Sequence, residues 1–322
     1  MSLLNSRQMA EFAARGILRL DGVVPDAVNR AFMQQMTQVP DEAPRQHMQR
    51  LMSSRAVPVV APGTALDKAY APDTPVQDML RVPAVAGAIE SLVGRQPVVD
   101  HHFLHTTFPG GKSQHLHQDS TIDPRLSFDV QLFYFPHAVD KTMGGTRYVP
   151  GTHLRIVSEM GIGRYQNMLG QQRMVCPAGT VALFHHGIWH GAGANRSSTH
   201  RYVLKIRLCP TSPQQRLWDL SDLPDDHVDQ RPVFWSDPGD TPDPVQRILM
   251  TSEPWFEQDT GRLEYMNRIR LWRYLIGDPT FDVDYWMTRV ENEQAVAQDG
   301  AGSGCIRRQA PAVSPRAPSS AA

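Results

Sequence analysis

One short motif in the chain combines the residue types of a metal site. His117 and Asp119 are separated by a single residue, and alternate residues of an extended strand point to the same face. In such a strand both side chains reach one metal ion, and a third ligand must come from elsewhere in the fold. Two histidines and one carboxylate around a metal with open positions are typical of non-haem iron(II) oxygenases. A His-x-Asp spacing alone is weak evidence, because it occurs by chance in many proteins.

A second segment contains a candidate for the third ligand. His190 follows an expected strand at 180–184, and Arg201 lies eleven positions later in a further expected strand. A hairpin between these two positions lets both side chains point into the same barrel. Arg201 then offers a planar guanidinium that can bind a carboxylate through two parallel hydrogen bonds. Together the two segments predict a metal centre with an anion-binding group beside it.

The segments that must position these residues have the pattern of short strands. From residue 97 to 209, runs rich in β-branched and aromatic residues alternate with Gly and Pro turn residues. Several short strands at regular spacing predict an antiparallel sandwich or barrel. The expected strands are Val98–Val99, Phe103–Phe108, Phe128–Phe135, Arg147–Val149, Arg173–Val175, Thr180–Phe184 and Arg201–Leu208.

Apolar residues at helical spacing flank this strand-rich region on both sides. A helix, a short strand at 17–20 and a second helix are expected within residues 6–38, and another helix at 83–94. Residues 211–292 have helical patterns with many aromatic side chains, which predicts a layer packed against the barrel. The predicted organisation is a single domain over 1–292, made of an N-terminal support at 1–96, a barrel core at 97–210 and a helical layer at 211–292, followed by a disordered tail at 293–322.

The overall composition favours a small-molecule partner. The chain has 322 residues, 41% apolar residues and a net charge of -1, which is ordinary for a globular protein. Its positive charges are scattered, so neither nucleic acid nor an anionic membrane surface is expected as partner. The N-terminus lacks the pattern of a secretory signal, and no apolar stretch is long enough to span a bilayer. We therefore expect a cytoplasmic protein that acts as a monomer or homodimer.

The motifs together resemble the phytanoyl-CoA dioxygenase family of iron(II)/2-oxoglutarate oxygenases, and the resemblance covers most of the chain. It implies a mainly β fold with flanking helices. The core would be a double-stranded β-helix of jelly-roll or cupin-like form, in which two sheets face each other and helices pack on one outer side. The segments that carry the resemblance are Arg15–Gly22, His117–Asp119, Gly144–His153, Ala178–His185, His190-Gly191 and Arg201.

The resemblance implies a role for each residue of the predicted centre. His117, Asp119 and His190 would hold Fe(II), and Arg201 would bind the distal carboxylate of the co-substrate 2-oxoglutarate. With O2, such an enzyme converts 2-oxoglutarate to succinate and CO2 and hydroxylates a small organic molecule. Halogenating relatives lack the carboxylate that Asp119 provides here, so its presence favours hydroxylation.

Three further positions follow from the resemblance. Phe133 falls where the family often has an aromatic residue near the co-substrate, and Lys68 matches a lysine that some members use for the same carboxylate. Family members often have a serine or threonine two residues after the second histidine ligand, where it donates to 2-oxoglutarate. This chain has Ala192 at that position. One hydrogen bond to the co-substrate is therefore expected to be missing or replaced.

Two other functions and several substrates remain open at this point. An iron oxygenase on the same barrel that does not need 2-oxoglutarate is favoured by Ala192 and opposed by Arg201. A non-catalytic barrel would keep the three ligands for binding or structure only, because a fold does not guarantee an activity. The substrate classes are an acyl-CoA, an amino acid or compatible solute, and a secondary metabolite. The lack of a basic cluster favours a smaller molecule over a CoA ester.

Overall fold

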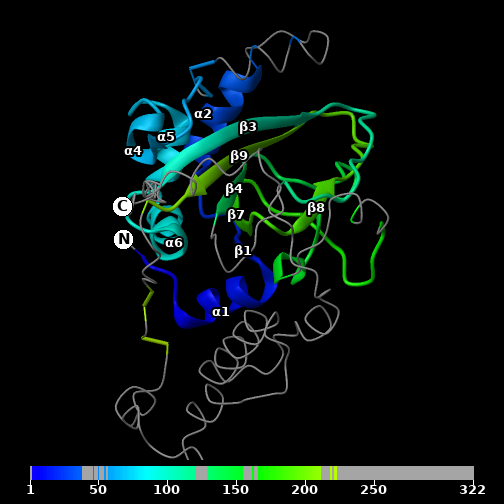
Figure 1. Cartoon of the computed structure of the whole chain (residues 1–322). Coiled ribbons are helices and arrows are strands. Elements are labelled where there is room, and N and C mark those ends of the chain that lie inside the picture. The colour runs from blue at the N-terminus through cyan, green and yellow to red at the C-terminus, as the bar shows by residue number, and fades with distance from the viewer. Residues whose placement is uncertain are drawn as a thin grey trace, which may run out of the picture.

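The computed structural model of the protein places most of the N-terminal two thirds of the chain (Figure 1). The predicted C-terminal layer at 211–292, apart from residues 211, 218–219 and 221–222, and the predicted tail at 293–322 lie outside the described residues. None of the helices in the described part is long and apolar enough to cross a membrane. The described residues are 2–37, 46, 50, 54–55, 57–119, 129–154, 162, 166–211, 218–219 and 221–222.

A six-stranded antiparallel sheet forms the larger half of the core. Its strands run in the order β1-β7-β4-β9-β3-β2, so neighbours in the sheet are mostly distant in the sequence. The longest-range pairing joins β1 to β7, where Ile17 lies opposite Phe184, and the pairing of β9 with both β4 and β3 brings the last described strand to the centre of the sheet. The strands are β1 (Ile17–Leu20), β2 (Thr64–Ala65), β3 (Val98–Thr107), β4 (Val130–Phe135), β7 (Thr180–His185) and β9 (Arg201–Cys209).

A smaller sheet faces the first one. It contains β6 (Gln172–Arg173), β5 (Thr146–Val149) and β8 (Trp189–Ala192) in that order. The segment 114–117 lies along the free edge of β8, where the Gln114 amide donates to the carbonyl oxygen of Ala192 at 2.9 Å. Two facing antiparallel sheets with this order of strands form a double-stranded β-helix, so the predicted fold is confirmed.

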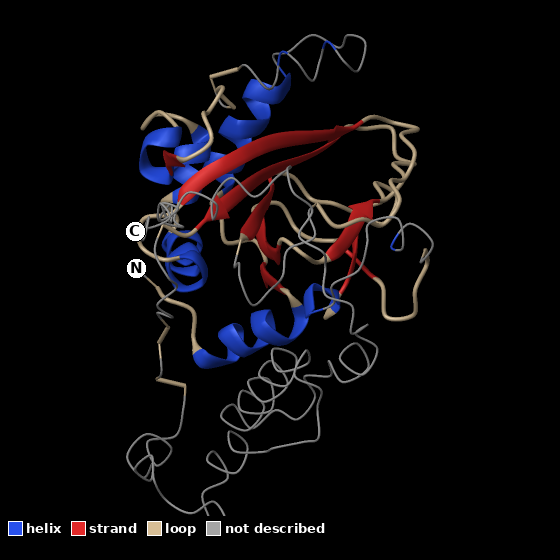
Figure 2. Cartoon of the chain, viewed as in Figure 1, coloured by secondary structure: helices blue, strands red, loops and turns tan. Residues whose placement is uncertain are grey.

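Helices cover the outer face of the larger sheet (Figures 1 and 2). Apolar residues of these helices and of the outer faces of β4, β7 and β9 form one buried cluster. The first helix begins at a capping box, in which Asn5 and Gln8 each satisfy the other's main-chain N–H. The helices are α1 (Ser6–Arg15), α2 (Asp26–Thr37), α4 (Leu66–Ala69), α5 (Pro75–Leu80), α6 (Pro83–Val93) and the 3-10 turn η1 (Thr152–Leu154).

Alternation along β9 separates the packing layer from the interior of the barrel. Tyr202 and Leu204 belong to the cluster under the helices, whereas Val203 belongs to a second cluster between the two sheets. Because successive side chains of a strand point to opposite faces, Arg201 and Lys205 lie on the same inner face as Val203. The polar residues of β9 are therefore directed into the barrel.

The structure differs from the sequence prediction at β3. Separate strands were expected at 98–99 and 103–108, but the chain forms one strand from Val98 to Thr107. A register shift between Val99 and His101 marks an irregularity in its pairing with β9. A bulge of this kind breaks the strict alternation of apolar and polar residues, so the sequence pattern looks like two strands.

The corner between α1 and β1 depends on a glycine packed against a buried histidine. Gly16 has φ 71°, and a Cβ atom added there would lie 2.4 Å from Nδ1 of His153. The His153 Nε2–H donates to the carbonyl oxygen of Ala13 at 3.0 Å. His153 thus has a structural role, because its hydrogen bond connects the end of α1 to the turn that follows β5.

Replacement of Gly16 by alanine should destabilise the protein more than the same change at Gly22. Both glycines have positive φ, 71° and 64°, but a Cβ at Gly22 would meet its nearest atom only at 3.8 Å. The left-handed backbone costs roughly 1 kcal/mol in each variant. Overpacking against His153 adds about 1–3 kcal/mol for Gly16→Ala only. Urea unfolding of the two variants measures this difference, and equal losses of stability would contradict it.

His153 should also make the stability depend on pH. Burial lowers the pKa of His153 from 6.5 to about 4, and its Nδ1 atom has no hydrogen-bond partner in the part of the chain that the structure describes. Between these values the unfolded chain binds a proton that the folded chain does not, so stability falls as the pH drops from 6.5 to about 4. This group contributes at most about 3 kcal/mol to that loss. In His153→Gln, the free energy of unfolding should depend less steeply on pH across this range. An unchanged slope would show that His153 does not cause the pH dependence.

Candidate metal centre

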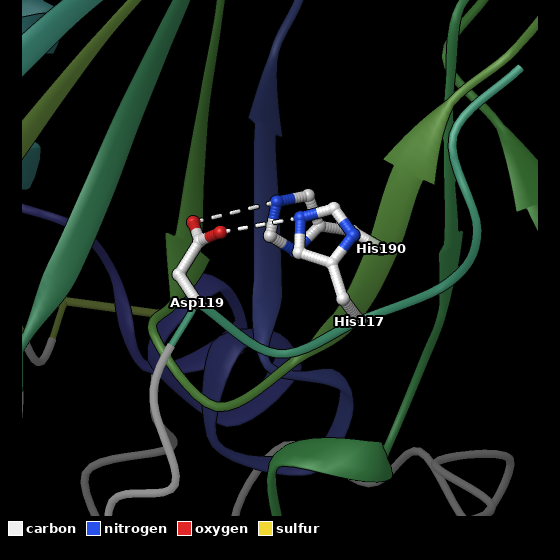
Figure 3. Close-up of side chains that lie close together, drawn as sticks. All are labelled: His117, Asp119 and His190. Atoms are coloured by element: carbon white, nitrogen blue, oxygen red, sulfur yellow. Dashed lines mark ion pairs between the residues drawn. The ribbon is translucent and has the colours of Figure 1, made fainter. Parts of the chain in front are cut away.

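The structure brings His117, Asp119 and His190 together at one point inside the barrel (Figure 3). Their ligand atoms all lie within 4.8 Å of one another. The Nε2 atom of His117 is 3.3 Å from Oδ1 of Asp119, and Nε2 of His190 is 3.5 Å from Oδ2. One nitrogen from each ring and both carboxylate oxygens thus converge on a common space.

Direct pairing of the main chain sets the distance between the two histidines. His190 lies on β8, and the N–H group of each histidine donates to the carbonyl oxygen of the other at 2.9 Å. His117 therefore forms an isolated bridge, and the expected regular strand through His117 and Asp119 is wrong. The two rings lie on the same side of the pair, with centroids 4.7 Å apart.

Main-chain carbonyls determine which nitrogen of each ring carries hydrogen. Nδ1 of His117 lies 2.9 Å from the carbonyl oxygen of His115, and Nδ1 of His190 lies 3.1 Å from that of Ile188. A carbonyl oxygen only accepts, so Nδ1 is the protonated nitrogen in both rings. The lone pair of each neutral ring is then on Nε2, which is the arrangement that a metal ligand requires.

Asp119 is held as a carboxylate. Burial alone would raise the pKa of Asp119, but its contacts with His190, His117 and the Gln131 amide lower it well below its usual range. The Gln131 amide donates to Oδ2 of Asp119 and also contacts Nδ1 of His186 at 2.9 Å. Burial lowers the pKa of His190 to about 3. At neutral pH the site thus contains an ionised carboxylate beside a neutral imidazole.

Arg201 is a buried cation at the first position of β9. Its side chain donates to the carbonyl oxygens of Met143 and Gly193 and, at 2.8 Å, to the hydroxyl of Thr107. The residue is 0% exposed, its Nε–H has no partner, and it makes no ion pair with an acidic residue in the described part of the chain. Burial lowers the pKa of Arg201 to about 10. A buried guanidinium without a counter-charge is suited to bind an anion.

Phe133 lies in the interior, next to His190 of the candidate metal centre. It is fully buried on β4, and its ring packs edge-on to that of His190 with centroids 5.8 Å apart. Ala192 follows His190 on β8 and its amide N–H donates to the side chain of Gln114 at 3.1 Å. The methyl group of Ala192 offers no hydrogen-bond donor, so the expectation of a missing or replaced bond to the co-substrate stays a prediction.

Lys68 is not part of this arrangement. It is exposed on α4, where the neighbouring Leu66 amide bonds to Pro97 beside the first residues of β3. Arg201 pairs with Thr107 at the other end of β3. A strand of ten residues spans roughly 30 Å, so the two cations do not meet.

The structure adds one residue that the sequence reasoning missed. Lys205 lies on β9 directly opposite Phe133, and its Nζ atom is 3.2 Å from Nε2 of His190 and 4.6 Å from the centre of the Phe133 ring. Burial lowers its pKa, and the charge of Asp119 opposes that shift. Its spacing of four residues from Arg201 along an expected strand is the signal that could have revealed it, because both then share one face.

The fold and the site together define a double-stranded β-helix with a His-x-Asp and a distant histidine at a common centre. Residues 12–203 match the model of the family described as phytanoyl-CoA dioxygenase (PhyH). The chain belongs to this family. No curated protein matches it.

Two solved structures illustrate the similarity of the fold. EctD from S. alaskensis with bound Fe is 16% identical with a TM-score of 0.50, over 68% of this chain and 80% of that chain. SnoK, a non-heme alpha ketoglutarate dependent carbocyclase from nogalamycin biosynthesis, is 17% identical with a TM-score of 0.48, over 65% of this chain and 85% of that chain. The likeness to EctD supports the same fold.

Alanine in place of Gly191 should weaken metal binding. A Cβ atom there would lie 2.6 Å from the carbonyl oxygen of His115, so the added methyl group pushes β8 away from the segment that carries His117. We expect a loss of about tenfold or more in Ni(II) affinity, comparable to other changes around metal ligands, in a competition titration with a chelator. Gly187→Ala is the matched control, because its Cβ would meet no atom closer than 3.4 Å. Equal affinities of the two variants would refute this role of Gly191.

Proposed function

We propose that the protein is an iron(II)- and 2-oxoglutarate-dependent dioxygenase that hydroxylates a small organic molecule. One observation carries the proposal, namely that the described part of the barrel contains both a three-residue metal centre and a buried cation, Arg201, without an acidic partner. Membership in the phytanoyl-CoA dioxygenase family supports the same reaction class. Asp119 is in place, which favours hydroxylation over halogenation.

The donor set fits a divalent transition metal. His117, Asp119 and His190 offer two imidazole nitrogens and a carboxylate, and both imidazoles present a lone pair at Nε2. Nitrogen and oxygen donors of this kind suit Fe(II), and three protein ligands leave positions for other molecules. These three residues would hold the iron, while Gln131 fixes the orientation of the carboxylate through its hydrogen bond to Asp119.

The environment of Arg201 fits a carboxylate of the co-substrate. The carbonyl oxygens of Met143 and Gly193 and the hydroxyl of Thr107 fix the plane of the guanidinium, and its Nε–H has no partner among the described residues. A preorganised cation of this kind binds a carboxylate without having to order its own side chain. Arg201 would therefore hold the distal carboxylate of 2-oxoglutarate.

The remaining residues control the surroundings of the reaction. When bound, iron and 2-oxoglutarate together supply the oxidising power, and O2 gives one oxygen atom to succinate, as CO2 leaves, and one to the substrate. Phe133 and Phe184 are fully or almost fully buried and line the interior beside His190. Their apolar rings exclude water from the centre, which strengthens the electrostatic interactions there.

Arg201→Ala should weaken the binding of 2-oxoglutarate. Loss of a charge-assisted hydrogen bond costs about 1.5–3 kcal/mol, which corresponds to roughly ten- to a hundredfold in affinity. Anaerobic addition of 2-oxoglutarate to the Fe(II)-loaded protein, followed by the visible charge-transfer band, measures this affinity. Lys68→Met serves as the control, because Lys68 is exposed and lies near the opposite end of β3. The affinity of this variant for 2-oxoglutarate should equal that of the wild type.

The same titration separates the rival functions. Metal binding without a charge-transfer band in the wild type would point to an iron oxygenase that does not use 2-oxoglutarate, or to a non-catalytic barrel. A band without release of succinate in air would leave only a binding role. Formation of one succinate per hydroxylated product, in a screen of small molecules, would establish the hydroxylase.

A further inference from the structure

Lys205 is an interior residue that the proposed function does not yet use. Its Nζ atom lies 3.2 Å from Nε2 of His190, the atom that would bind the metal, and over the face of Phe133. In the described part of the chain it makes no ion pair within 4.0 Å. By contrast, the buried Arg207 two positions further along β9 is paired with Asp129 at 2.5 Å.

An ammonium group in this place is unfavourable once a metal is bound. Lys205 and a divalent ion on His190 would be neighbouring positive charges in a site with little water, where like charges repel strongly. Asp119 is the nearby carboxylate that acts on Lys205, and it would already be a ligand of the metal. An additional anion between the metal and Lys205 would remove this repulsion.

Lys205 and Arg201 form two separate positions for anions. The two residues share the inner face of β9 at a spacing of four residues, which corresponds to about 13 Å along a strand. Arg201 is 0% exposed, whereas Lys205 is only half-buried and lies opposite Phe103, whose exposed fraction is 38%. Lys205 is therefore nearer to the open side of the barrel, through which a second molecule can enter.

We propose that Lys205 is a second carboxylate-binding residue of this site, which receives a carboxylate directly beside the metal. The proposal rests on the function proposed above. The carboxylate can come from two sources, the metal-proximal end of 2-oxoglutarate or an acidic primary substrate. In either case Lys205 positions the anion, while Arg201 holds the distal carboxylate of the co-substrate.

Calorimetric titration of the Ni(II)-loaded full chain tests the proposal and separates the two sources. The titrants are 2-oxoglutarate, 2-oxovalerate, which lacks the distal carboxylate, and acetate added to the complex with 2-oxoglutarate. The variants are Lys205→Met, which removes the charge, and Lys205→Arg, which keeps it. Lys112→Met is the matched control, because Lys112 is exposed outside the metal centre. Thermal melting shows whether each variant is folded, and Lys205→Gln replaces Lys205→Met if the latter is not.

Each outcome decides the question. If Lys205→Met lowers the affinity for both keto acids tenfold or more and Lys205→Arg retains it, the carboxylate that Lys205 binds belongs to the co-substrate. If Lys205→Met leaves both keto-acid affinities unchanged but abolishes the binding of acetate, the carboxylate belongs to an acidic substrate. If neither the keto acids nor acetate distinguishes Lys205→Met from the wild type, Lys205 is a packing residue and the proposal is wrong.

The failure of the proposed function would be recognised separately. In that case neither the Ni(II)-loaded wild type nor the Ni(II)-loaded Arg201→Ala variant would bind 2-oxoglutarate. Acetate titrated into the Ni(II)-loaded protein alone would then decide the role of Lys205, since the wild type but not Lys205→Met should bind it. Absence of acetate binding in both would overturn the proposal as well.

Discussion

The hydrogen-bonded pairing between His117 and His190 is the constraint on which the centre depends. The two residues are 73 positions apart in the sequence, yet each donates its main-chain N–H to the other at 2.9 Å. Opposite residues of an antiparallel pair have their side chains on the same face. The spacing of the two candidate histidine ligands is therefore set by the backbone, and the rest of the barrel holds these two segments side by side.

The inner face of β9 shows how the fold accommodates positive charge. Arg207 is neutralised by Asp129 and also approaches Asp100, whereas Arg201 is bonded to neutral oxygens and Lys205 makes no ion pair in the described part of the chain. Burial of an unpaired charge is costly. Of these cations, Lys205 lies beside the candidate metal centre, where a bound anion would provide the missing negative charge. Unpaired buried charges make the fold less stable than paired charges would, and in the proposed function these charges bind anions.

The sequence predicts the strands and the ligands because both depend on local patterns. The strand at 17–20, the His-x-Asp spacing and the position of Arg201 after His190 all reflect the short repeat of an extended chain. Lys205 was missed because its proximity to His190 arises from pairing of β9 with β4, which no local pattern reveals. Lys68 was predicted to bind the co-substrate because it matches a family position only loosely, and the sequence alone does not show how far it lies from Arg201. The oxygens that orient the two imidazoles belong to the main chain, so no residue type could identify them.

This last feature affects how the protein can change through mutation. The groups that orient the ligand rings are the carbonyl oxygens of His115 and Ile188, which every amino acid possesses. Substitution at these two positions can alter packing or the shape of the pocket without removing the oxygen that sets the protonated nitrogen. In sites where a carboxylate side chain orients the imidazole, one mutation removes that control. The barrel can therefore acquire new residues around its centre, and with them new substrate preferences, while the tautomers of its histidine ligands stay the same.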